Sequence, residues 1–270
     1  MSKMLKYGRT VGVTREETGL PYYKYFTQPM ASVPPEKLAL LDQGPLENGL
    51  PFEDRNMFLS GRDEELGYAQ VGWGINRDGT GFVANTTYMP GVTGAMLDWW
   101  FPWHSVGSDL RYKIWDPKDH YFARADSVAY VCNPRIPVNQ KTWGVDHYIM
   151  ENTGMGPEFL QLCFKRPRDF GFDEGLVGSE TCESLVCAIG KSKVAAAMTH
   201  KWYPWKDGVM FCSRFWIGYG EVQGKIIRTL PEGIRVPAEA PKGLFHHTIE
   251  EFANLAAILP EVYGENRDNW

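Results

Sequence analysis

Two histidine–glutamate pairs lie near the carboxyl end of the chain, within residues 245–255. His247 and Glu251 are four residues apart, and so are His246 and Glu250. In a helix, residues at this spacing lie one turn apart on the same face. An imidazole nitrogen and a carboxylate oxygen held in this way can bind one Zn²⁺ ion at about 2.0–2.2 Å each. The same spacing is typical of a surface ion pair, and the surrounding apolar residues do not decide which pair faces inward.

A third glutamate is predicted to point inward from a strand. Residues 145–151 form a predicted strand, and its alternation places His147, Ile149 and Glu151 on one face. A carboxylate among apolar neighbours is costly unless it is paired. A metal ion shared with a helical pair would stabilise it.

The remaining histidines offer a fourth ligand or an acid–base group. His120 ends the turn-like segment 116–120, where the segment alone favours an exposed loop histidine over a functional one. His104 competes with it, although a histidine at a helix carboxyl end is also favoured by the helix dipole. His200 and His147 are candidate proton carriers or hydrogen-bonded strand residues. The chain has no CxxC spacing, no P-loop, no GxGxxG fingerprint and no GxSxG elbow, which argues against thiolate zinc, nucleotide and serine-hydrolase sites.

An α+β fold is predicted to position these residues. The turn at 76–79 indicates a hairpin, Thr93 is predicted to cap a helix that runs to His104, and an amphipathic helix over 242–259 is expected to end at Pro260. We therefore expect a curved antiparallel sheet wrapped around the C-terminal helix, with a cavity between them. The predicted strands are 68–75, 81–88, 110–115, 127–132, 145–151, 158–164, 183–189, 193–202 and 209–219.

The first part of the chain differs from the rest in composition. Frequent prolines interrupt helices and strands before residue 64, and one short helix is predicted at 35–41. We interpret residues 1–64 as an N-terminal arm or small subdomain and residues 65–270 as the main domain.

Composition limits the classes of function. The 270 residues are 43% hydrophobic and 14% aromatic, which predicts a folded protein whose aromatic residues fill a core, an interface or an apolar cavity. The net charge of −5 and the pI of about 5.7 give no general attraction to nucleic acid or anionic lipid. With five cysteines and neither a secretory signal nor a transmembrane stretch, we expect a reduced, cytoplasmic protein.

Several motifs between residues 67 and 263 occur together in a characteristic order. They are MPGVT at 89–93, DWWFPWH at 98–104, RYKIWDP at 111–117 followed by His120, RFWIG at 214–218, and HTIEEF at 247–252. In this order they resemble the diacetylphloroglucinol hydrolase/phloretin hydrolase family, whose members cleave the carbon–carbon bond between an acyl group and a phloroglucinol ring.

The resemblance implies a fold and a metal. The fold would be the helix-grip fold of the Bet v1 and START proteins, preceded by a small N-terminal domain, and the chain would form a homodimer. The metal would be a zinc ion held by two histidines and two glutamates. Matched motif by motif, the zinc ligands fall on His120, Glu151, His247 and Glu251.

The resemblance also implies roles in catalysis. Tyr112 matches a substrate-binding tyrosine, and His200 matches a further active-site histidine, with His147 as the alternative proton carrier. Ala123 stands where the family has an asparagine, which implies an acyl group other than that of diacetylphloroglucinol. The predicted substrate-binding residues are Tyr112, Tyr219, Trp103 and His104.

These observations lead to one main hypothesis and two alternatives. The main hypothesis is zinc-dependent hydrolysis of a small acylphloroglucinol, with phloretin giving phloroglucinol and 3-(4-hydroxyphenyl)propanoate. One alternative is hydrolysis of diacetylphloroglucinol. The other is a non-catalytic carrier of aromatic or lipid-like ligands, since a fold alone does not specify a function.

Overall fold

The computed structural model of the chain describes residues 11–62 and 65–270. Within these ranges, one antiparallel sheet contains eight strands in the order β1-β2-β8-β7-β6-β5-β4-β3, and β9 and β10 form a separate hairpin. The strands are β1 (Gly72–Ile75), β2 (Gly81–Pro90), β3 (His120–Ala125), β4 (Asp146–Glu151), β5 (Glu158–Lys165), β6 (Ser184–Lys191), β7 (Ala196–Trp205), β8 (Gly208–Ile217), β9 (Tyr219–Val222) and β10 (Lys225–Arg228).

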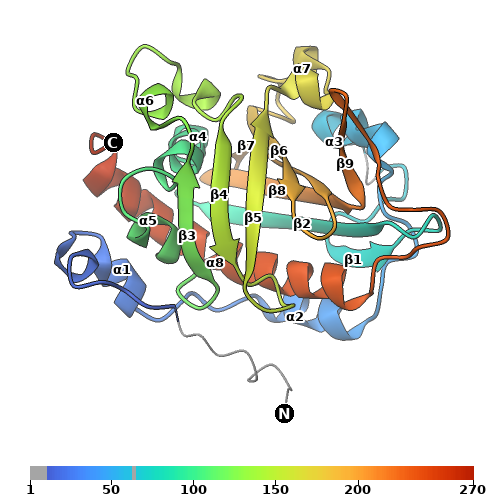
Figure 1. The fold of residues 1–270 in the computed structure, drawn as a ribbon, viewed down its shortest axis with the longest axis horizontal. Helices are drawn as coiled ribbons and strands as arrows, with labels where there is room; N and C mark the ends of the chain where they lie inside the picture. Colours follow the sequence, from blue (N-terminus) through green and yellow to red (C-terminus); the bar gives the residue numbers. More distant parts are fainter. Residues whose placement is uncertain (1–10, 63–64) are drawn as a thin grey trace.

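The longest helix, α8, lies along this sheet. Figure 1 shows β3, β4 and β5 running across the direction of β1, β2 and β8, so the sheet is strongly curved, and α8 packs against β1 and β2. The helices are α1 (Tyr23–Thr27), α2 (Pro35–Asp42), α3 (Arg55–Ser60), α4 (Gly94–Trp103), α5 (Leu110–Lys113), α6 (Val128–Val131), α7 (Pro167–Phe170) and α8 (Glu239–Asn266). Short 3₁₀ turns are η2 (Glu17–Gly19), η3 (Phe52–Asp54), η4 (Val138–Gln140) and η5 (Glu174–Leu176).

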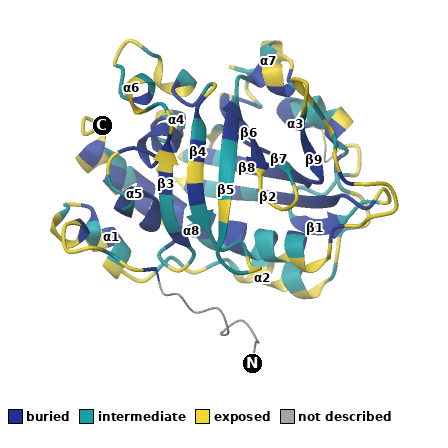
Figure 2. Cartoon of the chain, in the orientation of Figure 1, coloured by how far each residue is buried: buried dark blue, intermediate teal, exposed yellow. Residues whose placement is uncertain are grey.

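Apolar cores form on both faces of the sheet. One core lies between the sheet, α4 and α8 and contains Phe215 and Phe252. The other lies under residues 50–59 of the N-terminal segment (residues 11–62) and under α7, and contains Phe58, Phe170 and Trp216. Because side chains alternate along a strand, neighbouring residues of β8 enter different cores. Burial on both faces accounts for the largely buried central strands in Figure 2.

Most of the larger predicted elements are confirmed. The chain has an α+β architecture with a large antiparallel sheet and a C-terminal helix. The predicted hairpin is formed by β1 and β2, with Gly79 at φ 89° in its turn. Thr93 is the N-cap residue of α4, and α2 begins at Pro35, as expected for a proline at the first helical position.

Two predicted strands are wrong, because both segments are helical. Residues 110–115 contain α5, whose four residues are all buried instead of alternating, and Ser108 Oγ accepts a hydrogen bond from the Leu110 N–H at 3.2 Å. Residues 127–132 contain α6, closed by the Val131 N–H donating to the Ser127 carbonyl. Four-residue segments are too short for hydrophobic periodicity to separate the two structures.

The predicted end of the last helix is also wrong, because α8 continues through Pro260 to Asn266. Proline inside a helix removes one hydrogen bond and usually bends or ends it. Here the extra turns are held by tertiary contacts. Val262 is fully buried, and the Lys24 ammonium bridges Glu261 and Glu265 at 2.9 and 2.6 Å.

The sequence does not predict β3, although this strand starts at His120. In β3, His120 pairs with Glu151 of β4, and a register shift separates His120 from Phe122. The preceding Asp-Pro turn and the exposed Arg124 conceal the strand in the sequence. The pairing places a histidine and a glutamate side by side at one end of the sheet.

The five cysteines all lie within the described ranges, and none of them forms a disulfide. Among the described residues, no helix combines the length and hydrophobicity needed to cross a bilayer.

Candidate metal centre

Helix α8 directs one of its two histidine–glutamate pairs inward. His247 and Glu251 are buried, and the distance from His247 Nε2 to Glu251 Oε1 is 3.9 Å. Glu250 instead accepts a hydrogen bond from the Lys118 ammonium at 2.7 Å and lies 3.8 Å from His246 Nε2. Tertiary packing thus resolves the choice that helical periodicity leaves open.

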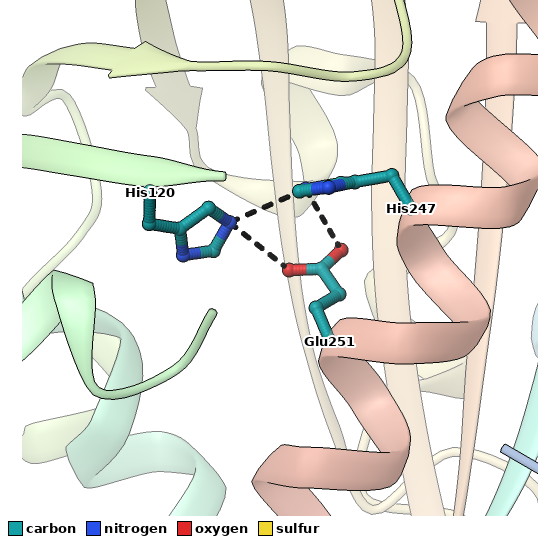
Figure 3. Close-up of side chains that lie close together, drawn as sticks. All are labelled: His120, His247 and Glu251. Carbon is teal, nitrogen blue, oxygen red and sulfur yellow. Dashed lines mark hydrogen bonds and ion pairs between the residues drawn. The ribbon is translucent and has the colours of Figure 1, made fainter. Parts of the chain in front are cut away.

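His120 brings a second imidazole to this pair from β3. Its Nε2 lies 3.2 Å from His247 Nε2 and 3.6 Å from Glu251 Oε2. Figure 3 shows the His120 ring directed at both side chains of α8. Its Nδ1 lies 3.2 Å from the Tyr112 carbonyl oxygen, and the two rings stack with centroids 3.9 Å apart. A carbonyl can only accept, so His120 Nδ1 carries the proton and its Nε2 presents a lone pair to the centre.

Glu151 reaches the same point from the end of β4. Its Oε2 lies 3.7 Å from His120 Nε2, and the Tyr112 hydroxyl donates a short hydrogen bond to that oxygen. The β3–β4 pairing that places Glu151 opposite His120 accounts for this approach. The structure therefore brings the four predicted ligands to one region.

The spacing of these atoms fits a tetrahedral metal. Ligand atoms about 2.0–2.2 Å from such an ion lie roughly 3.3–3.6 Å from one another. The two imidazole Nε2 atoms lie 3.2 Å apart, and His120 and His247 lie 3.6 and 3.9 Å from Oε2 and Oε1 of Glu251, respectively, which is close to this range. Two imidazole nitrogens and carboxylate oxygens are a donor set that zinc accepts.

Burial makes this cluster unfavourable without a cation. Desolvation lowers the pKa of His120 well below its ordinary value, and His247 adds to the effect. Desolvation also raises the pKa of Glu251 well above its ordinary value, helped by repulsion from Glu151. The pKa of Glu151 is raised by its own burial. A divalent cation would compensate both carboxylates and use the neutral imidazoles as ligands.

A cavity of about 410 Å³ opens beside the cluster. Polar residues of its lining that lie at or near the cluster include His104, Tyr112, Glu151, His200, His247 and Glu251. Its apolar lining includes Leu160, Leu162, Phe164, Met198, Phe215 and Ile217. The space suits a small aromatic molecule with one polar end placed beside the cluster.

Two further histidines reach this cavity in different hydrogen-bonding states. His104 Nδ1 donates to the Trp100 carbonyl at 3.0 Å, which leaves its Nε2 as an acceptor. His200 Nδ1 lies 2.7 Å from the Ser213 hydroxyl, which can donate or accept. Burial lowers the pKa of each histidine to about 3, so both rings are neutral near pH 7.

Three predicted site residues do not line the cavity. His147 is fully buried behind it, against Phe164, and both of its ring nitrogens lack a hydrogen-bond partner. Trp103 donates its indole N–H to the Asn269 carbonyl at 2.7 Å. Tyr219 packs in the core on the other face of the sheet. These three residues therefore lie outside the cavity lining, although the His147 ring meets the His104 ring edge-on with centroids 5.8 Å apart.

Two polar residues beside the site were not singled out from the sequence. Ser213 pairs with His200 across the β7–β8 hairpin, and the two-residue turn at 206–207 sets this register. A hairpin assigned around this turn would have predicted that Ser213 lies beside His200. Asp116 lies with its Oδ2 3.8 Å from His247 Nδ1. Its position in an Asp-Pro turn indicates only a turn, because the contact with α8 is made in the folded chain.

A known protein family matches most of the chain. The family model described as the DAPG hydrolase PhiG domain matches residues 50–264. The chain belongs to this family. The matched residues include the four predicted metal ligands, which are His120 in β3, Glu151 in β4, and His247 and Glu251 in α8.

The chain is also similar to named proteins over most of their length. The chain is 64% identical over 266 residues to phloretin hydrolase of Eubacterium ramulus, which covers 97% of this chain and 96% of that protein. It is 27% identical over 265 residues to 2,4-diacetylphloroglucinol hydrolase of Pseudomonas protegens, which covers 91% of this chain and 84% of that protein.

Proposed function

We propose that the chain hydrolyses the carbon–carbon bond that joins the acyl group of phloretin to its phloroglucinol ring. The products are phloroglucinol and 3-(4-hydroxyphenyl)propanoate. The observation that carries this proposal is the 64% identity to a phloretin hydrolase over nearly the whole chain. The cavity supports it, because an apolar space ends at a cluster of polar groups.

We further propose that the metal is Zn²⁺ and that His120, Glu151, His247 and Glu251 hold it. Their donor types and the 3.2–3.9 Å distances among three of them support this choice. When bound, zinc supplies a Lewis acid that polarises the substrate ketone and acidifies water.

The reaction needs a proton on the ring carbon that carries the acyl group. Proton transfer to this carbon first converts the ring to a ketone tautomer, so no aryl carbanion has to leave. Water then adds its oxygen to the ketone carbon of the acyl group, and the bond from that carbon to the ring breaks. The ring leaves as an enolate that takes up the proton lost by water and becomes phloroglucinol, and the acyl group leaves as the carboxylic acid. Proton transfer by a positioned side chain is worth about 10²–10⁴-fold in rate.

His200 is the residue best placed to carry this proton. Its neutral imidazole can take a proton from water or a ring hydroxyl and pass it to the ring carbon. The Ser213 hydroxyl can turn between donating and accepting, so His200 keeps its hydrogen bond in either state.

His104 and Tyr112 are placed to orient the substrate. His104 presents an acceptor to the cavity and suits a ring hydroxyl that donates. The Tyr112 hydroxyl holds Glu151 in position and borders the same space.

Metal removal tests the zinc part of the proposal. A chelator-treated preparation should release no phloroglucinol from phloretin, and added Zn²⁺ should restore the release. Full activity in a preparation shown by elemental analysis to be metal-free would contradict it. The substrate is tested separately, because faster release of product from 2,4-diacetylphloroglucinol than from phloretin would favour the alternative activity.

We also propose the finer features of the architecture and assembly. A curved sheet around one long helix supports assignment to the helix-grip fold of the Bet v1 kind. The sheet starts at Gly72, which supports a division into 1–64 and 65–270. The exposed rings of Tyr148 and Phe159 on β4 and β5 are compatible with a homodimer. The cytoplasmic location stays a prediction.

A further inference from the structure

The carboxylate of Asp116 faces the back of the His247 ring. Asp116 is fully buried in the turn between α5 and β3. Its Oδ1 accepts the backbone N–H groups of Lys118 at 2.9 Å and Asp119 at 3.2 Å. Its Oδ2 has no hydrogen-bond partner and lies 3.8 Å from His247 Nδ1, which also has none.

Two unpartnered buried atoms that face each other require an explanation. Leaving a buried donor or acceptor unsatisfied costs about 1–3 kcal/mol, and more when the group is charged. The nearby charged groups do not serve Asp116, since the Lys118 ammonium binds Glu250 and the Asp119 carboxylate accepts from the Asn152 amide. A small rotation of His247 or Asp116 would turn the 3.8 Å approach into a hydrogen bond.

We propose that Asp116 is a positioning residue, which accepts a hydrogen bond from His247 Nδ1–H and so keeps His247 Nε2 unprotonated and directed at the metal. The proposal rests on the zinc centre proposed above. A carboxylate behind a ligating imidazole fixes its tautomer and strengthens it as a ligand. His120 differs, because its Nδ1 is held by the neutral carbonyl of Tyr112.

A second cation between Asp116, Asp119 and His247 is the competing explanation, because one ligand atom from each lies within 4.8 Å of the others. The existing hydrogen bonds argue against it. Asp116 Oδ1 is already shared by two backbone N–H groups, and Asp119 Oδ1 accepts from Asn152 Nδ2 at 2.8 Å. Calcium and magnesium require more free oxygen ligands than remain here.

The substitution Asp116→Asn tests the proposal sharply. The amide oxygen must keep accepting the two backbone N–H groups, which places the amide NH₂ opposite His247 Nδ1. A donor at that position favours the imidazole tautomer with its proton on Nε2, so this nitrogen has no lone pair to offer the metal. We expect zinc affinity, measured by competition with a chelating dye, to fall by about 10–100-fold.

Glu250→Gln is the matched control, because it removes one nearby negative charge without changing the partner of His247. Its zinc affinity should stay within about threefold of the wild type, since an exposed ion pair contributes little. The unfolding temperature of the metal-free Asp116→Asn chain should be no lower than that of the metal-free wild type, because the substitution removes a buried charge.

Three outcomes would overturn the assignment. Unchanged zinc affinity in Asp116→Asn would show that the carboxylate does not position His247. A wild-type chain with two tightly bound ions, one of which Asp116→Asn loses, would make Asp116 a ligand. A wild-type chain that binds no zinc would overturn both this inference and the metal centre, whereas the first two outcomes leave the proposed hydrolysis standing.

Discussion

Tyr112 contacts the residues of the candidate metal centre through three different groups. Its carbonyl accepts from His120 Nδ1, its ring stacks on the His120 ring, and its hydroxyl donates to Glu151. Burial and the neighbouring Glu151 hold the pKa of Tyr112 well above its ordinary value, so the hydroxyl stays protonated and remains a donor. A substitution that removes only the hydroxyl therefore separates its role from the two others.

Tyr112→Phe should lower kcat/KM for phloretin by about 10–100-fold, because a hydrogen bond to a charged group in a buried site is worth about 1.5–3 kcal/mol. The zinc content should remain near that of the wild type, since the ring and the carbonyl are unchanged. Steady-state kinetics and elemental analysis measure the two quantities. Tyr263→Phe, which changes a tyrosine packed on Trp99 outside the cavity lining, is the control. Loss of zinc together with activity would contradict this division of roles.

At the residue scale, the sequence identifies candidate metal ligands by residue type and spacing, but it does not show which of them come together in the fold. Helical spacing identifies His247 and Glu251 as a candidate pair but does not exclude His246 and Glu250, since both pairs border the apolar face. His120 was assigned only through the family resemblance, because its own segment reads as a turn. These groups come together because β3 pairs with β4 and α8 packs against the sheet. Neither contact can be predicted from short stretches of sequence.

At the scale of elements, prediction succeeded where the segments were long or had a strong turn signal. The β1–β2 hairpin and α8 carry such signals, whereas α5 and α6 have four residues each. The helix end at Pro260 was misplaced because the contacts that stabilise the last turns come from the N-terminal segment. The elements that place His120 were thus the least predictable part of the fold.

Helix α4 is attached to β6 by a titratable hydrogen bond. Asp98 accepts from the Ser184 hydroxyl at 2.7 Å, and burial raises the pKa of Asp98 from 3.8 to about 6. A raised carboxyl pKa means that the folded state favours the protonated form. The stabilising contribution is therefore complete below about pH 3.8 and is lost as the pH rises through about 6.

Asp98→Asn should remove this pH dependence, because the amide stays neutral and can still accept from Ser184. Relative to the variant, the metal-free wild type should lose up to about 3 kcal/mol of unfolding free energy between about pH 4 and pH 8. Urea denaturation of both proteins at several pH values measures this difference. A difference that stays constant with pH would contradict the assignment of the titration to Asp98.

At the scale of the whole molecule, the cavity combines a polar cluster with a mostly apolar wall. Exposed residues that line it come from the β4–β5 turn, the β6–β7 turn and the segment before α8, and include Met155, Lys193 and Pro237. These three segments form the mouth of the cavity. Because Lys193 is exposed, a hydroxyl group reaching the mouth can bind water as well as protein.

This arrangement predicts which hydroxyl groups of phloretin matter. The analogue that lacks the 4-hydroxyl of the phenylpropanoyl group should keep its kcat/KM within about tenfold, since an apolar pocket discriminates weakly against such a change. An analogue that lacks one hydroxyl of the phloroglucinol ring should lose about 100-fold or more, because a buried polar partner is left unpaired. Phloroglucinol or resorcinol release, measured chromatographically, tests both. Equal losses for the two analogues would contradict the prediction.

Strand β7 is in contact with two different parts of the protein. Ala196, Met198 and His200 line the cavity, whereas Ala197 belongs to the core under the N-terminal segment and the Lys201 ammonium donates to the Phe58 carbonyl. Substitutions that change the preferred acyl group and substitutions that change thermal stability would therefore fall on alternating positions of β7. A mutant library confined to Ala196 and Met198, with His200 kept, could alter substrate choice and leave the odd-numbered positions free to be varied for stability.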